Sequence, residues 1–386
     1  MDLSSLIPAV EAQQSAFVAN LCTLVEEESP SEDRQAVNRA NELVAALAGP
    51  FVRRIKLHKQ KHFGDILQLD FGQAGSGQTR SRRPPLLLLG HLDTVWPLGT
   101  LRSMPFRQAG GRLWGPGVLD MKAGVVMALT ALKVLHEMDA GRPVTLLLNP
   151  DEEVGSPVSR ALTERLAQRS SAVFVLEPAQ GLAYKTARKG VGLYTLHVTG
   201  VAAHAGVDFE RGHSAILELA RLIEQVSAFT DLDKRRTVNC GVIHGGTRSN
   251  VIAAEAYAEI DVRTDTARDA AAVDKLFRRL KVTDPCCKLT LTGGVNRPPM
   301  ERRPGTVALF QRARKLAAEL GPKWGFPLDE ASTGGGSDGN FTAALGIPTL
   351  DGMGAVGEGA HAAHESILIE HLVPRTALLA AMIAAS

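Results

Sequence analysis

Short apolar runs bounded by turn-forming residues constrain this chain most, because each has the length of a buried strand. Three such runs lie at Leu86–Leu89, Val144–Leu148 and Ala172–Leu176, and a fourth apolar segment lies at Ile347–Leu350. Helical patterns lie between them. After Asp120, for example, apolar residues recur at helical spacing as far as Leu135. Strands that alternate with helices predict an α/β fold, with a large mixed, mostly parallel sheet that carries helices on both faces.

The middle of the chain shows a different order of elements. Strand, helix, strand, strand, helix and strand patterns follow one another at Leu193–Thr199, Ser214–Phe229, Thr237–Ile243, Ala254–Val262, Ala267–Leu280 and Lys288–Thr292. This β-α-β-β-α-β order is the ferredoxin-like α+β arrangement, which forms a small domain of its own. The flanking segments Lys185–Gly190 and Gly293–Gly305 are rich in Gly, Pro or basic residues and are interpreted as hinges.

Two domains are therefore expected. A length of 386 residues already exceeds that of one ordinary core. We predict a large α/β domain built from residues 1–188 and 299–386. A smaller α+β domain, over residues 189–298, is inserted into it.

Charge excludes two classes of partner. The formal net charge of +2 is too small to indicate nucleic acid or an anionic membrane as the main partner. Arg80, Arg82 and Arg83 form a local basic cluster, but the Gly, Ser and Gln residues around them predict a solvated loop. No apolar run reaches the roughly 18 residues of a membrane span.

The cysteines and the N-terminus indicate a cytoplasmic protein. None of the four cysteines has a partner at metal-ligand spacing, and Cys286 and Cys287 are adjacent, which is poor geometry for an ordinary disulfide. We expect reduced thiols, as in the cytoplasm. The first residues lack the basic start and apolar run of a secretory signal.

Histidine and carboxylate residues follow the strands of the predicted large sheet. The first run ends in His91 and Asp93, the second in Glu152 and Glu153, and the third in Glu177. Ligands of open α/β sheets bind beyond the carboxyl ends of the strands. These side chains are therefore predicted to meet at one edge of the sheet.

Two further residues extend this set. Asp120 lies just before the predicted helix, and His361 lies in a Gly-rich loop. One or two imidazoles with three or four carboxylates suit Zn²⁺, Mn²⁺ or Co²⁺ better than Ca²⁺ or Mg²⁺. Each residue alone has an ordinary explanation, and Asp120 in particular has the position of a helix N-cap. Their joint occurrence at strand ends favours a metal site.

The chain resembles the zinc metallopeptidase family of glutamate carboxypeptidase, aminoacylase, acetylornithine deacetylase and succinyl-diaminopimelate desuccinylase. The matching stretches run in family order over nearly the whole chain, and the inserted domain falls where this family carries its lid. They are GHLDTVWPLG (90–99), GPGVLDMKAG (115–124), NPDEEVGS (149–156), LEP (176–178), GVAAHAG (200–206), GGTRSNVIAAEAYAEIDVR (245–263), GGGSDGNF (334–341) and GEGAHAAHES (357–366).

The resemblance implies a ligand set for two zinc ions, with Co²⁺ or Mn²⁺ as substitutes. Asp120 would bridge the two ions. His91 and Glu177 would complete one site, and Glu153 and His361 the other. The family's spacing of a histidine followed four residues later by a glutamate selects His361 rather than the nearby histidines at 364 and 371.

The resemblance also implies roles around the metals. Glu152 would be the general base, and Asp93 would orient His91 and fix its tautomer. The family carries a cis peptide after the bridging aspartate, which here is the bond between Asp120 and Met121. His364 is interpreted as a helix-start residue without a metal role.

The inserted domain would bind the substrate and close over it. His204 matches a histidine that in this family reaches across a dimer interface to polarise the scissile carbonyl. Asn250 and Arg263 match positions that hold the substrate's carboxylate or the oxyanion, although Arg263 also fits a surface arginine at a strand end. Backbone N–H groups of the Gly-rich loop, including Gly335 and Gly336, could also receive a carboxylate. A homodimer through the lid is implied.

The implied activity is hydrolysis of an amide bond next to a free carboxylate. Glu177 and the GGGSDGN loop resemble the glutamate carboxypeptidase branch, so the expected substrate is an N-acyl amino acid or short peptide that ends in Glu or a similar residue. An N-acetyl or N-succinyl amino acid deacylase is the main alternative. Two further alternatives remain open, a free-amine dipeptidase and a catalytically silent binder of small ligands.

Overall fold

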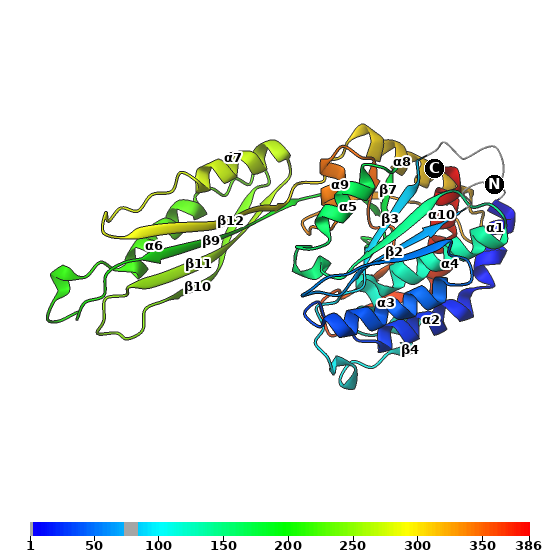
Figure 1. The fold of residues 1–386 in the computed structure, drawn as a ribbon. Coiled ribbons are helices and arrows are strands. Elements are labelled where there is room, and N and C mark those ends of the chain that lie inside the picture. The colour runs from blue at the N-terminus through cyan, green and yellow to red at the C-terminus, as the bar shows by residue number, and fades with distance from the viewer. Residues whose placement is uncertain (1–2, 73–83) are drawn as a thin grey trace. The chain divides into compact units, whose positions relative to one another are not determined.

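The computed structural model describes residues 3–72 and 84–386, so the predicted loop at Arg80 to Arg83 lies outside the described residues. The chain divides into two compact units (Figure 1). The large unit contains Met1–Ala187, Arg302–Ser332 and Ser337–Ser386, and the small unit contains Arg188–Glu301 and Thr333–Gly336. The four residues Thr333–Gly336 join the small unit through contacts such as the hydrogen bond from the Lys189 N–H group to the Thr333 carbonyl, at 2.9 Å.

The large unit is built around a mixed sheet. Among the described residues, six strands form it in the order β1 (Arg54–His58), β2 (Ile66–Phe71), β6 (Val144–Asn149), β3 (Leu86–His91), β7 (Val173–Val175) and β14 (Thr349–Leu350). Strands β6, β3, β7 and β14 are mutually parallel. At one side β2 pairs antiparallel with β6, and β1 pairs antiparallel with β2. The predicted mixed, mostly parallel sheet is confirmed.

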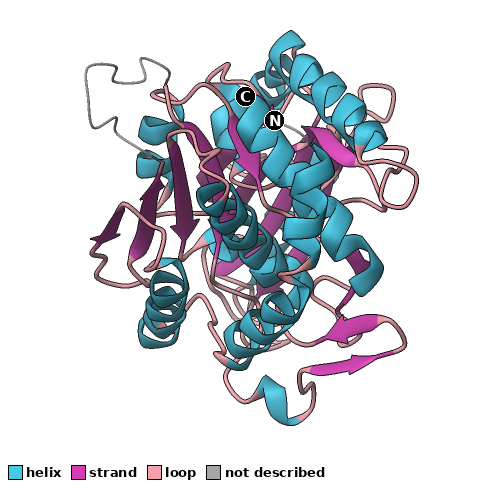
Figure 2. Cartoon of the chain, turned by 90° about the vertical axis from the view of Figure 1, so that its right-hand side faces the viewer, coloured by secondary structure: helices cyan, strands magenta, loops and turns pink. Residues whose placement is uncertain are grey.

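Helices cover both faces of this sheet (Figure 2). They are α1 (Leu3–Glu11), α2 (Gln14–Glu26), α3 (Arg34–Ala48), α4 (Ala123–Glu137), α5 (Arg160–Ala167), α8 (Pro304–Glu319), α9 (Gly339–Ala344) and α10 (Leu372–Ala385). The two-residue period of a strand divides the core. Leu86 and Leu88 of β3 pack with the helices α1, α2, α4 and α10, whereas Leu87 and Leu89 pack with α5.

The small unit pairs a four-stranded antiparallel sheet with two helices. Its elements are β9 (Gly190–Thr199), α6 (Ala215–Ser227), β10 (Thr237–Gly245), β11 (Glu255–Thr264), α7 (Ala267–Phe277) and β12 (Lys288–Arg297). The strands lie in the order β10-β11-β9-β12. Both helices pack on one face of the sheet (Figure 1). On that face Leu222 of α6 and Phe277 of α7 share an apolar core with alternate strand residues such as Leu196 and Ile260. This is the β-α-β-β-α-β order that the sequence pattern indicates.

The first segment interpreted as a hinge is largely strand, and the second is strand as far as Arg297. Tyr184–Arg188 forms β8, which pairs with β13 (Glu330–Thr333), and Gly190 begins β9. Gly293 belongs to β12 and pairs with Tyr194 of β9. At Gly293 a Cβ atom would lie 2.0 Å from the Leu193 carbonyl oxygen, and φ is +85°. The glycine thus allows a close approach of two strands, which the sequence pattern alone cannot distinguish from a flexible link.

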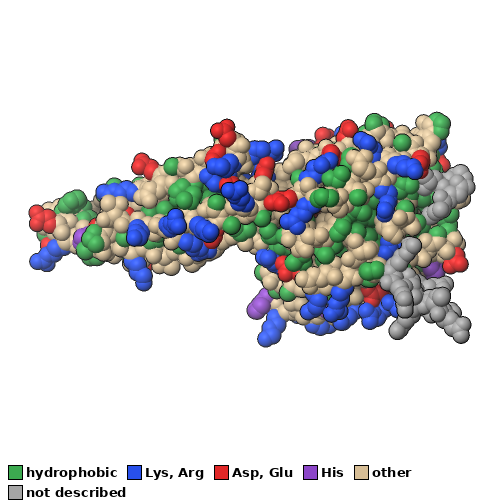
Figure 3. All heavy atoms as spheres, turned by 90° about the horizontal axis from the view of Figure 1, so that it is seen from above, with side chains coloured by type: hydrophobic (Ala, Val, Ile, Leu, Met, Phe, Trp, Pro, Cys, Tyr) green, Lys and Arg blue, Asp and Glu red, His purple; other side chains and the backbone are tan. Residues whose placement is uncertain are grey.

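A second small sheet completes the large unit. It joins β4 (Arg107–Ala109) and β5 (Arg112–Trp114) to β15 (Gly357–Glu358) and β16 (Ser366–Leu368). No helix among residues 3–72 and 84–386 is long and apolar enough to cross a membrane. Acidic, basic and apolar side chains are interspersed over the surface seen in Figure 3, as the small net charge leads one to expect.

Candidate metal centre

The parallel strands of the large unit deliver three site residues to one edge of the sheet. His91 is the last residue of β3, and Glu177 follows β7 by two residues. Glu153 lies in a 3-10 turn, Glu152–Val154, shortly after β6 ends. Strands β6, β3 and β7 are parallel neighbours, so their carboxyl ends meet at the same edge. The geometry that the sequence predicts from strand ends is therefore present.

Asp120 lies between two imidazoles. Its Oδ1 is 3.3 Å from His91 Nε2, and its Oδ2 is 3.3 Å from His361 Nε2. His91 Nε2 is also 3.5 Å from Glu177 Oε1, and His361 Nε2 is 3.2 Å from Glu153 Oε2. Two groups of three potential ligands result, and Asp120 belongs to both.

The donor atoms of this cluster fit a divalent cation. His91 Nε2, Asp120 Oδ1 and Glu153 Oε1 are buried, and none of the three makes a hydrogen bond within the described part of the chain. Buried polar atoms normally make hydrogen bonds, so three such atoms without one in the same cluster indicate a missing partner. Imidazole nitrogen and carboxylate oxygen together suit Zn²⁺ and its neighbours in the transition series.

Electrostatics in the metal-free protein point the same way. Burial disfavours a charge on His91, yet the carboxylates of Asp120, Asp93 and Glu177 raise the pKa of His91 well above its usual value. Asp120 and Glu153 raise the pKa of His361 to about 10. Protons on the two imidazoles thus compensate the negative charge of the neighbouring carboxylates. A bound cation would compensate the same charge in their place.

Asp93 is buried behind these ligands and organises them. The Nδ1 atom of His91 lies 2.9 Å from the Asp93 main-chain oxygen and 3.4 Å from its carboxylate. The carboxylate itself accepts the backbone N–H groups of Glu152 at 3.2 Å and Glu153 at 3.1 Å, and the Ser31 hydroxyl at 2.7 Å. Its main contacts are thus with the loop after β6, in addition to the contact with His91 that the resemblance implies.

The structure excludes the alternative role that the sequence left open for Asp120, which is that of a helix N-cap. The peptide bond between Asp120 and Met121 is cis, as the resemblance implies. Asp120 is not the N-cap of α4, because that helix begins at Ala123 and its N-cap residue is Lys122. The local backbone at Asp120 is non-helical, with φ −113° and ψ 92°, and Asp120 lies two residues before the N-cap residue.

Two buried residues support this segment, and sequence reasoning gave them no role. The Glu365 carboxylate accepts the N–H groups of Gly117, Leu119 and Asp120 at 2.9 to 3.0 Å. Burial lowers the pKa of Lys122 to about 8, and its ammonium donates to a main-chain carbonyl of the α2–α3 connection at 2.8 Å. The glutamate four positions after His361 served in the sequence analysis only to select that histidine, and the lysine two positions after Asp120 was an unused signal.

The competing histidines do not join the cluster. His361 belongs to it, with φ +63° in the turn after β15. His364 lies in the same turn and not at a helix start, so that interpretation of His364 was wrong. His371 is the N-cap residue of α10, and its Nε2 lies 3.6 Å from Glu370.

The remaining site residues lie in the small unit. The His204 backbone pairs with Val251, and its Nδ1 accepts the Gly206 N–H group at 3.1 Å. The Asn250 carbonyl accepts the Ala205 N–H group at 3.0 Å, so Asn250 and His204 occupy adjoining segments.

Arg263 is engaged within the small unit. Its guanidinium pairs with Asp261 at 2.7 Å and donates to the Gly334 carbonyl at 3.2 Å. The carbonyls of Gly335 and Gly336 accept hydrogen bonds from Arg188 at 3.2 and 3.1 Å. Two arginines therefore shape the Gly-rich loop.

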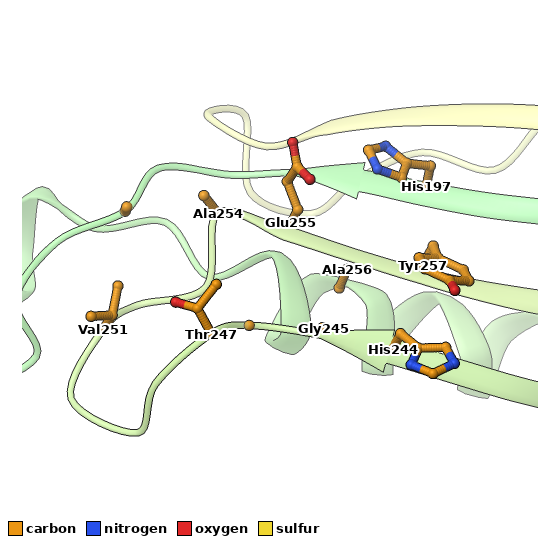
Figure 4. A pocket seen from close by; sticks show the side chains of 11 residues that line it. His197, His244, Gly245, Thr247, Val251, Ala254, Glu255, Ala256 and Tyr257 are labelled. Atoms are coloured by element: carbon orange, nitrogen blue, oxygen red, sulfur yellow. The ribbon is translucent and has the colours of Figure 1, made fainter.

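The small unit also has a hollow of about 470 Å³ on the sheet face away from its helices (Figure 4). His244, Tyr257 and His197 are register neighbours across β10, β11 and β9 and form its floor. Gly245 to Thr247 and Val251 line one end, on either side of the segment that contains Asn250. Sequence reasoning did not find this hollow, because it depends on the register of three strands.

A mostly parallel α/β sheet that gathers two imidazoles and three carboxylates at its carboxyl edge is the architecture of a metal-dependent hydrolase. The chain belongs to peptidase family M20/M25/M40, whose sequence profile matches residues 87–385. The family resemblance carried by the motifs is confirmed.

Individual relatives share much of the chain. Carboxypeptidase G2 from Pseudomonas sp. (strain RS-16) is 31% identical over 388 residues, which cover 97% of this chain and 90% of that protein. Succinyl-diaminopimelate desuccinylase from Xylella fastidiosa is 28% identical over 334 residues, which cover 81% of this chain and 84% of that protein. The chain is thus similar to a carboxypeptidase and to a deacylase.

Solved structures share the fold. Aminopeptidase PepT from Bacillus cereus superposes with a TM-score of 0.72 at 21% identity, over 96% of this chain and 98% of that chain. An M20 family metallo-carboxypeptidase from Sulfolobus solfataricus gives a TM-score of 0.71 at 16% identity, over 95% and 98% of the two chains. At these identities the likeness is one of fold.

Proposed function

We propose that this protein is a di-zinc carboxypeptidase that releases Glu or a similar amino acid from N-acyl or peptide substrates. The observation that carries the proposal is the pair of three-residue ligand groups that share Asp120. In such centres two metal ions hold one bridging carboxylate, and Co²⁺ or Mn²⁺ can replace Zn²⁺. The similarity to carboxypeptidase G2 over 97% of the chain supports the choice of substrate class.

The chain's own residues would divide the work as follows. His91, Asp120 and Glu177 would hold one ion, and Asp120, Glu153 and His361 the other. When bound, such ions polarise a carbonyl and lower the pKa of a water to about 7. Glu152 would accept the proton of the attacking water and pass it to the leaving nitrogen.

Glu152 is suited to this role by its position. It directly precedes Glu153, and Asp93 holds the backbone N–H groups of both residues. It belongs to neither ligand group, so its carboxylate is not assigned to a metal. His204, Asn250, Arg263, Gly335 and Gly336 of the small unit would bind the carbonyl and the carboxylate of the substrate, which makes this unit the substrate lid.

We also propose a homodimer that forms through the small unit. Strand β10 lies at an edge of the four-stranded sheet, and Ile243 on it is 55% exposed. Leu217 on α6 is 54% exposed. An edge strand beside exposed apolar side chains can pair with a second copy of the chain. Sedimentation of the protein and of the Ile243→Asp variant tests this assignment.

A substrate panel tests the activity. Purified protein with added Zn²⁺ is given N-benzoyl, N-acetyl and N-succinyl amino acids, acylated glutamates and unblocked dipeptides, and release of free amino acid is measured. We expect turnover of acylated or peptidyl glutamate, and none in the Glu152→Ala variant. Turnover confined to acetyl or succinyl compounds would instead identify a deacylase, to which the desuccinylase from Xylella fastidiosa is the relevant relative. Cleavage of free-amine dipeptides alone would overturn the proposed substrate class.

A further inference from the structure

A second group of potential metal ligands lies in the small unit. His213, Asp284 and Cys286 each offer one ligand atom, and these three atoms lie within 4.8 Å of one another. His213 Nδ1 is 2.7 Å from Asp284 Oδ2. The three residues come from two segments, the one before α6 and the one between α7 and β12. None of them belongs to the candidate metal centre of the large unit.

The backbone holds His213 in place. Its N–H group donates to the Val201 carbonyl and its carbonyl accepts the Val201 N–H group, both at 2.9 Å. The next residue, Ser214, caps α6 by accepting the Leu217 N–H group at 3.2 Å. The imidazole therefore projects from a paired segment beside a helix start.

A buried carboxylate shapes the other segment. Glu218 of α6 is 1% exposed, and it accepts the N–H groups of Thr283 and Asp284. Asp284 Oδ1 accepts the Cys286 N–H group at 2.9 Å, which closes a tight turn. Oδ1 is thereby used within the turn, and Oδ2 faces His213. Such support behind a ligand is typical of metal sites.

We propose that His213, Asp284 and Cys286 bind a divalent zinc-like ion, with a fourth position open to water. Nitrogen, oxygen and sulfur donors in one group suit Zn²⁺ or Co²⁺, and a thiolate excludes Ca²⁺ and Mg²⁺ as preferred ions. On binding, the Cys286 thiol releases its proton to solvent, and Sγ forms the bond to the ion.

The ligand atoms must shift to reach tetrahedral spacing. With metal–ligand distances of about 2.1 Å for nitrogen and oxygen and about 2.3 Å for sulfur, tetrahedral ligand atoms lie about 3.3 to 3.6 Å apart. The contact between His213 and Asp284 must therefore lengthen by about 0.7 Å, and Cys286 Sγ, which lies within 4.8 Å of the other two ligand atoms, must approach them by up to about 1.2 Å. Both side chains are roughly three-tenths exposed, and Cys286 is exposed, so there is room for this shift.

A bound ion would cross-link two segments of the small unit. Val201 and His213 pair at the base of a segment that contains His204 and Gly206. A metal ion on His213 would fasten this base to the turn that precedes β12. An ordinary ion pair between His213 and Asp284 is the competing explanation. That explanation gives Cys286 no role, which makes the cysteine the discriminating residue.

The test is a titration of the metal-free full-length protein with Co²⁺, followed by absorption spectroscopy. The candidate ligands in the large unit are nitrogen and oxygen atoms, so a thiolate-to-cobalt charge-transfer band reports a cysteine-containing site. We expect this band in the unmodified protein and in Cys240→Ser, a matched control whose cysteine lies outside the group. The band should be lost in Cys286→Ser and in His213→Gln, with one less equivalent of bound metal, and added Zn²⁺ should abolish it.

Two results would overturn the proposal. One is the absence of a thiolate band in the unmodified protein at saturating Co²⁺. The other is a band that persists in Cys286→Ser, which would assign it to another cysteine. Because Cys286 is exposed, its replacement by serine leaves the core intact. Hydrogen exchange of residues 201–213 gives a second readout, since bound metal should slow it in the unmodified protein and not in Cys286→Ser.

Discussion

The Asp93 carboxylate accepts the backbone N–H group of Glu153 at 3.1 Å, and so ties the end of β3 to the turn after β6. The same carboxylate holds the N–H group of Glu152 at 3.2 Å. One buried aspartate therefore sets the position of a candidate metal ligand and of the candidate general base. The first two predictions separate these consequences.

Replacing Asp93 should weaken metal binding. In Asp93→Ala the N–H groups of Glu152 and Glu153 lose their acceptor, and His91 loses a neighbouring carboxylate. Loss of such support typically lowers metal affinity about 10- to 100-fold. Competition with a chromophoric chelator measures the dissociation constant for Zn²⁺. Asp233→Ala, at an exposed aspartate of the small unit, is the control, and equal affinities in the two variants would contradict the supporting role of Asp93.

Replacing Glu152 should abolish turnover and leave the metal bound. General acid–base groups contribute about 10²- to 10⁴-fold to rate, and Glu152 belongs to neither ligand group. We expect Glu152→Ala to lose activity by that factor on a substrate that the unmodified protein cleaves, with unchanged metal content by elemental analysis. Glu137→Ala, on the exposed face of α4, should keep full activity. Loss of metal from Glu152→Ala would reassign this residue as a ligand.

Metal binding should release protons and should weaken as the pH falls. In the metal-free protein Asp120 and Glu153 raise the pKa of His361 to about 10, above the ordinary 6.5, so this imidazole carries a proton at neutral pH. A metal ion must displace that proton, and acid therefore opposes binding. Zinc titration calorimetry in buffers of different ionisation enthalpy counts the protons released. We expect fewer in His361→Gln and an unchanged number in His364→Gln.

The same pKa shift has a consequence for stability without metal. Because the folded-state pKa of His361 is raised, its ion pairs stabilise the metal-free fold fully below pH 6.5 and lose this effect as the pH rises towards 10. His361 is about half exposed, which reduces the size of the effect. The free energies of unfolding of the metal-free protein and of His361→Gln, measured with denaturant, should therefore converge at high pH. A constant difference between the two free energies of unfolding from pH 6 to 10 would contradict the raised pKa of His361.

Gly124→Ala should destabilise the large unit. Alanine gains up to about 1 kcal/mol over glycine inside a helix, but a Cβ atom at Gly124 would lie 2.1 Å from the Leu176 carbonyl oxygen. Helix α4 would have to move away from the chain just before Glu177, at a net cost of about 1–3 kcal/mol. Urea unfolding measures this cost. Gly141→Ala has no heavy atom closer than 4.0 Å and should be neutral, so equal stability of the two variants would show that α4 can shift freely.

The sequence pattern located the central strands because their signal is local. The apolar runs at Leu86–Leu89 and Val144–Leu148 agree with β3 and β6 to within two residues, and turn formers bound them. Parallel strands end at one edge, so the order of strands and polar residues along the chain was enough to assign those residues to one site. The two predicted hinge segments contain the boundaries between the compact units, at Ala187/Arg188 and Glu301/Arg302, but the pattern did not indicate that Gly293 lies within a strand.

By itself, the sequence indicated the class of fold, the family and the candidate ligands at the edge of the large sheet. Only the tertiary structure decided how these residues are supported. Glu365 reaches the backbone of Asp120 across 245 residues of chain, and Asp93 reaches Glu153 across 60. His213 likewise meets Asp284 across 71 residues. Periodicity and turn chemistry act over a few neighbouring residues, whereas a buried carboxylate finds its partners only when distant segments pack together and exclude water.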